Sequence, residues 1–68
     1  MKFGKVLKRL RKERGLLQRE VGVGAGVDNT LVSYLETNKR TPSFKTLANY
    51  STLFDIPVWE IVREAEES

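Results

Sequence analysis

A chain of 68 residues without cysteine or histidine must fold around a small core that neither a disulfide nor a zinc ion can stabilise. The same absence excludes zinc fingers and catalytic sites that use a cysteine or a histidine base. No group of acidic residues has the spacing of a calcium loop. The sequence therefore predicts one small domain, over residues 1–68, with no metal, no cofactor and no enzymatic activity.

Charge is unevenly distributed along the chain, whose formal net charge is +3. Residues 1–20 contain eight basic and two acidic residues, whereas residues 59–68 contain four Glu and one Arg. A basic end favours a polyanion as partner, and a solvated helix face is the alternative. Apolar runs are too short for a membrane span or a signal peptide. We expect a cytoplasmic protein, associated with the nucleoid of a prokaryote or encoded by a phage.

The spacing of apolar residues predicts an all-α fold of five short helices. The first carries apolar residues at the i, i+3, i+4, i+7 spacing: Phe3, Val6, Leu7 and Leu10. The second is expected from Gln18 to about Ala25. The third is expected from Asn29 to about Thr37, with Asp28 as its N-cap.

A fourth helix is expected after the turn-rich loop 37–43, with Ser43 as its N-cap. Its predicted inward side consists of Phe44, Leu47, Tyr50, Ser51 and Phe54. Asp55 ends this helix, and Pro57 opens a short fifth one. The last residues, 63–68, are expected to be a polar tail that frays.

Glycines at positions 22, 24 and 26 raise the question of a phosphate-binding loop. A dinucleotide fingerprint would place its third glycine where Val27 stands, and a triphosphate loop needs a Gly-Lys-Ser/Thr sequence that is absent. Residues 21–27 also alternate as in a strand, but no second strand is predicted to pair with it. The remaining interpretation is a helix whose interior Gly22 and Gly24 each cost about 1 kcal/mol relative to alanine.

Several groups of residues stand in the order and spacing of one known family. They are Leu10-Arg11, Gly15-Leu16, Gln18, Glu20, Gly26-Val27, Val32-Ser33, Leu35-Glu36, Lys39-Arg40 and Pro42-Ser43. On these residues, the stretch from Phe3 to Val62 resembles the phage repressor and Cro (xenobiotic-response-element-like) family of helix-turn-helix DNA-binding domains. The resemblance implies a lambda-repressor-like fold in which the second and third helices form the helix-turn-helix, about residues 18–36.

The resemblance also implies which residues contact double-stranded DNA. The third helix, residues 29–37, would lie in the major groove and read bases through Asn29, Thr30, Ser33 and Tyr34. Phosphates would be bound by Gln18, Arg19, Lys39 and Arg40. Each of these residues also has an interpretation without DNA. Gln18 could be an ordinary polar residue of a first turn, Tyr34 could pack on the domain surface, and Lys39 and Arg40 could be solvated loop charges. Arg11 and Glu36 would form a structural ion pair between the first and third helices.

The sequence departs from the family pattern in the second helix and near its end. Leu17 stands where a Ser or Thr cap is usual, and the glycines should make the second helix the softest element. Trp59 stands where an exposed acidic residue is more common. An exposed Trp59 beside Val58 suggests a dimer interface, and burial of Trp59 in its own core is the alternative.

The function that follows from the resemblance is sequence-specific regulation of transcription. We expect a homodimer that binds a pseudo-palindromic operator, with repression as its output and contact with RNA polymerase as a further possibility. The alternative is a protein-interaction module on the same scaffold, antitoxin-like or antirepressor-like, in which DNA binding is secondary.

Overall fold

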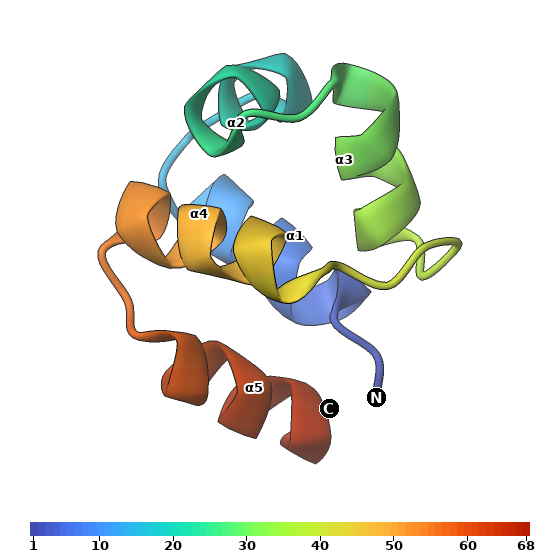
Figure 1. Cartoon of the computed structure of the whole chain (residues 1–68), viewed down its shortest axis with the longest axis vertical. Helices are drawn as coiled ribbons and strands as arrows, with labels where there is room; N and C mark the ends of the chain where they lie inside the picture. The colour runs from blue at the N-terminus through green and yellow to red at the C-terminus, as the bar shows by residue number, and fades with distance from the viewer.

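The computed structural model describes all of residues 1–68 and contains helices only. These are α1 (Gly4–Glu13), α2 (Gln18–Ala25), α3 (Asn29–Glu36), α4 (Phe44–Phe54) and α5 (Val58–Glu67). Figure 1 shows α2 at one end of the molecule and α5 at the other, with α1 and α4 between them. The predicted all-α fold of five short helices is confirmed. None of these helices is both long enough and apolar enough to span a membrane.

Every helix contributes to one apolar core. A fully buried side chain comes from each: Leu7, Val21, Val32, Tyr50 and Ile61. The Tyr50 ring meets the Phe54 ring edge-on, with centroids 5.4 Å apart. Burying a large apolar side chain stabilises a fold by about 1.5–3 kcal/mol, so each of the five helices is held to the domain by at least one such contact.

The ends of the helices follow local chemistry that the sequence predicts. Asp28 Oδ1 accepts a hydrogen bond from Leu31 N at 2.7 Å, and Ser43 Oγ accepts one from Thr46 N at 3.1 Å. Gly26 ends α2 in the left-handed conformation, with φ +72°. Both N-caps were expected from the residue types, and the glycine provides the turn between α2 and α3.

The two interior glycines of α2 lie at close approaches. A Cβ at Gly22 would stand 2.7 Å from the carbonyl oxygen of Val27, in the turn that leads to α3. A Cβ at Gly24 would stand 2.7 Å from Cδ1 of Leu53 on α4. At Gly22 helix propensity is thus given up so that the backbone of the turn can pack directly on α2, whereas at Gly24 the neighbour is only the end of a side chain.

The start of α2 has only half of a capping box. Leu17, at the N-cap, has no side-chain acceptor, but Glu20 Oε1 accepts a hydrogen bond from Leu17 N at 2.7 Å. One of the free amides at this helix end is thus satisfied by a side chain from within the first turn.

Two predictions about the later helices are wrong. Phe44 is 75% exposed because the first helical residue after the Ser43 cap turns toward solvent, whereas Leu47, Tyr50 and Phe54 do face the core. Residues 63–68 do not form a frayed tail. Helix α5 continues to Glu67 because Ala65, one turn after Ile61, is buried and extends the apolar stripe.

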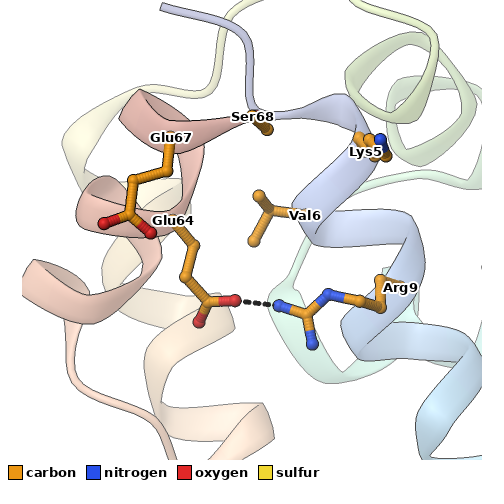
Figure 2. Close-up of a pocket in the computed structure, with 6 residues that line it drawn as sticks. All are labelled: Lys5, Val6, Arg9, Glu64, Glu67 and Ser68. Carbon is orange, nitrogen blue, oxygen red and sulfur yellow. Dashed lines mark hydrogen bonds and ion pairs between the residues drawn. The ribbon is translucent and has the colours of Figure 1, made fainter.

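An ion pair and a shallow groove join α5 to α1. Arg9 pairs with Glu64 across the two helices and with Glu13 on its own helix. The groove beside this pair has a volume of about 390 Å³, and Lys5, Val6 and Ser68 help to line it (Figure 2). The cationic and anionic side chains that line the groove balance one another. The ion pair between Arg9 and Glu64 connects α5 to α1 at this place.

Candidate nucleic-acid interface

Helix α3 has one buried side and one exposed side. Val32, Leu35 and Glu36 are buried. The predicted base-reading residues share the other side, because positions three and four apart, as in 29/33, 30/33 and 30/34, are neighbours on a helix. Among them Asn29 and Thr30 are exposed, Tyr34 is 39% exposed and Ser33 is half-buried. Helix α3 has eight residues, and an α-helix with its side chains is about 10–12 Å across, which fits the width of a DNA major groove.

The loop after α3 brings two exposed cationic residues to the end of that helix. The backbone amides of Lys39 and Arg40 donate to the carbonyl oxygen of Tyr34 at 2.9 and 3.3 Å. The Lys39 ammonium also lies 5.6 Å from the centre of the Tyr34 ring, a cation–π distance. Lys39 and Arg40 therefore lie at the margin of the side of α3 predicted to read bases.

The start of α2 forms a groove with the start of α3. Its volume is about 310 Å³, and its lining residues are Arg11, Leu17, Gln18, Arg19 and Asn29. Gln18 and Arg19 are the first two residues of α2, whose backbone amides have no partner within the helix. Predicted phosphate contacts from α2 and a predicted base contact from α3 thus border one concave surface.

Arg11 and Glu36 meet between α1 and α3. Arg11 Nε and Nη2 donate to the two Glu36 carboxylate oxygens at 2.7 and 3.1 Å, and Arg11 Nη1 donates to Leu16 O at 2.8 Å. The Glu36 side chain is 2% exposed. The hydrogen bond that Arg11 donates to Glu36 raises the pKa of Arg11, although burial opposes this, so the guanidinium stays charged. Gln18 joins the pair, because its Nε2 donates to Glu36 Oε1 at 3.2 Å.

Three positioning contacts lie outside what the sequence predicted. Asn49 Nδ2 on α4 donates to Ala25 O at 2.9 Å, at the end of α2. Asn38 Oδ1 accepts from Gly4 N at 3.0 Å, at the start of α1. Arg14 Nη2 donates to Phe54 O at 2.8 Å, at the end of α4. Each partner lies more than twenty residues away in the chain, so no local pattern could indicate it.

The residues predicted for a dimer interface lie on α5. Trp59 is 65% exposed and Val58 is half-buried, so burial of Trp59 within its own core is wrong. Helix α5 lies at the opposite end of the view from α2 (Figure 1). The structure therefore separates this exposed indole from the groove at the start of α2.

Known proteins share both the sequence pattern and the fold. A family described as helix-turn-helix matches residues 7–58. The transcriptional repressor RstR of the cryptic phage CTXphi from Vibrio cholerae is 34% identical over 65 residues, which are 94% of this chain and 58% of RstR. The transcriptional regulator SinR of Bacillus licheniformis is 33% identical over 67 residues, 97% of this chain and 60% of SinR. The chain thus spans about three fifths of the length of these relatives.

Two solved structures superpose closely. The restriction-modification controller protein C.AhdI from Aeromonas hydrophila has a TM-score of 0.83 at 32% identity, covering 88% of this chain and 91% of C.AhdI. The N-terminal DNA-binding domain of SinR from Bacillus subtilis has a TM-score of 0.81 at 33% identity, covering 88% of each chain. With the family match extending over most of its length, this chain belongs to the helix-turn-helix family of the phage repressor and Cro type.

Proposed function

We propose that this protein is a transcriptional repressor that binds a pseudo-palindromic DNA operator as a homodimer, with α3 in the major groove. The observation that carries the proposal is the outward side of α3, where Asn29, Thr30, Ser33 and Tyr34 stand together beside Lys39 and Arg40. Polar side chains on a short exposed helix can read base edges, and cations at its end can neutralise phosphates.

The relatives support the same function. RstR is a phage transcriptional repressor, SinR is a transcriptional regulator, and the matched part of Bacillus subtilis SinR is its DNA-binding domain. A dimer through Val58 and Trp59 would present two copies of α3 to successive major grooves, about 34 Å apart. Repression would result from occluding RNA polymerase, and direct contact with polymerase would instead allow activation.

Selection from random duplex DNA followed by footprinting tests the proposal. We expect two inverted half-sites spaced by one helical turn. Thr30→Ala and Tyr34→Ala should each weaken binding of the selected duplex about tenfold or more, whereas Thr52→Ala, at an exposed site on α4, should leave affinity unchanged. If both α3 variants bind like the wild type, α3 is not the reading helix.

Salt dependence separates this proposal from the protein-interaction alternative. Binding that rests on phosphate contacts weakens steeply as salt rises, with a slope close to the number of phosphates neutralised. Removing Lys39 or Arg40 should lower that slope by about one per operator half-site. A flat response to salt, or failure to recover any preferred duplex, would favour a protein partner.

A further inference from the structure

The side chain of Gln18 is hydrogen-bonded to a carboxylate that is buried and paired with an arginine. Its Nε2 donates to Glu36 Oε1 at 3.2 Å. Glu36 is 2% exposed and is held by two hydrogen bonds from Arg11. Arg11 is itself fixed to the Leu16 carbonyl. Arg11 and Gln18 both line the groove. The Arg11 guanidinium is held by three hydrogen bonds, whereas the Gln18 amide is held by one.

The chemistry of an amide makes this contact directional. Its oxygen only accepts hydrogen bonds, whereas its nitrogen carries two N–H donors. A carboxylate also only accepts, so only the Nε2 end of Gln18 can face Glu36. One N–H is used by Glu36, and the second N–H on the same nitrogen remains available to another acceptor. A DNA phosphate oxygen is such an acceptor, and the amide oxygen could not bind it.

The surrounding charges permit an anion at this place. Arg11 neutralises Glu36, so the buried carboxylate does not repel a phosphate. Arg19 lines the same groove and is exposed. The nearby Glu20 carboxylate accepts a hydrogen bond from Leu17 N, and the backbone amides of Gln18 and Arg19, in the first turn of α2, have no partner within the helix.

We propose that Glu36 is a positioning residue for DNA binding: it orients the Gln18 amide so that the second Nε2–H is directed at a backbone phosphate. The inference rests on the proposed function. Because Glu36 is the last residue of α3 and Gln18 the first of α2, the contact connects a phosphate to the far end of the reading helix. The ion pair thus helps to set how α3 is placed in the groove, in addition to stabilising the fold.

A double-mutant cycle on the duplex recovered by selection tests this role. Gln18→Ala should weaken binding about tenfold, the effect of one hydrogen bond to a charged group. Glu36→Gln should weaken it by a similar factor in the wild type and by almost nothing in Gln18→Ala. Binding is measured at a temperature at which circular dichroism shows that every variant is folded. A purely structural Glu36 would give the same loss in both backgrounds, which would overturn the inference.

Arg40→Ala provides the matched control. It removes a proposed phosphate contact whose side chain has no hydrogen bond to Glu36. The fold losses of affinity caused by Arg40→Ala and by Glu36→Gln should therefore multiply in the double variant. If wild-type protein selects no duplex, the proposed function fails. If wild-type protein binds and the Gln18 and Glu36 losses also multiply, only the inference about Glu36 fails.

A measurement on the wild-type protein covers the case in which Glu36→Gln does not fold. Gln18 is the only glutamine, so its side-chain amide gives a single pair of proton resonances in NMR spectra. In the free protein, the Nε2 proton that is hydrogen-bonded to Glu36 should exchange slowly with solvent. Adding the duplex should change mainly the chemical shift of the other Nε2 proton. Two protons that exchange equally fast in the free protein, or that shift equally with DNA, would contradict the proposed orientation.

Discussion

At the scale of single residues, Tyr50 stands out because its hydroxyl is buried without a hydrogen-bond partner. The residue is fully buried and packs on Phe54. Burial, and secondarily the negative charge of Glu36, raises the pKa of Tyr50 to about 12 from its ordinary 10.0. A buried hydroxyl without a partner destabilises the fold by about 1–3 kcal/mol, so the aromatic ring rather than the oxygen accounts for the contribution of Tyr50.

Tyr50→Phe should raise the free energy of unfolding by about 1 kcal/mol at neutral pH, because it removes the unpaired hydroxyl. It should also remove an alkaline loss of stability. The unfolded chain ionises Tyr50 near pH 10 and the folded protein only near pH 12. Stability contributed by the neutral phenol is therefore complete below about pH 10 and falls by about 1.4 kcal/mol by about pH 11.

Urea denaturation of both proteins across this pH range measures the difference. The comparison subtracts the titration of lysines, which the two chains share. Parallel stability curves from neutral pH to about pH 11 would show that Tyr50 ionises alike in both states.

At the scale of elements, the two interior glycines of α2 differ in what they face: Gly22 faces a backbone atom and Gly24 faces the end of a side chain. The backbone carbonyl that faces Gly22 belongs to the turn and accepts no displacement without moving α3. The group that faces Gly24 is the end of the half-buried Leu53 side chain, which can rotate. The same substitution at these two positions should therefore have opposite effects.

Gly22→Ala should lower the free energy of unfolding by about 2 kcal/mol, because a Cβ would contact the Val27 oxygen. Gly24→Ala should raise it by up to about 1 kcal/mol, since alanine favours the helix and Leu53 can move aside. Each variant serves as the control for the other in urea denaturation followed by circular dichroism. Equal effects would mean that helix propensity alone decides stability here.

The elements that could be predicted from the sequence are those with local causes. Asp28 and Ser43 mark the starts of α3 and α4 because a capping side chain acts within three residues. Phe44 was wrongly expected inside, since the apolar spacing cannot tell that the first turn of α4 projects into solvent. The link from Gln18 to Glu36 depends on how α2 and α3 pack, which no spacing in the sequence contains.

At the scale of the whole molecule, α5 carries the largest exposed aromatic side chain of the domain. Trp59 is 65% exposed, at the opposite end from α2. The domain measures only 26 × 24 × 22 Å, and a core this small gains stability when further apolar surface is buried. In the proposed homodimer, a second copy would cover Trp59 and leave the start of α2 free.

Trp59→Ala should raise the dimer dissociation constant about tenfold or more, because buried tryptophans dominate the binding energy of interfaces. Sedimentation velocity over a concentration series measures the change. Phe44→Ala is the matched control, since Phe44 is an aromatic residue on α4 that is 75% exposed. A dimer that persists unchanged in Trp59→Ala would place the interface elsewhere.

The hydrogen bonds that complete the helix ends also bear on protein engineering. Asn38 caps the start of α1, Arg14 the end of α4 and Asn49 the end of α2, each from a distant part of the chain. A helix-turn-helix cut out at 18–36 and grafted onto another scaffold would lose the cap from Asn49 together with the anchor at Arg11. On α3, Asn29, Thr30 and Tyr34 are exposed and Ser33 is half-buried. If α3 reads bases as proposed, new operator preferences are better sought by exchanging residues 29, 30, 33 and 34 within the intact domain than by transplanting the motif.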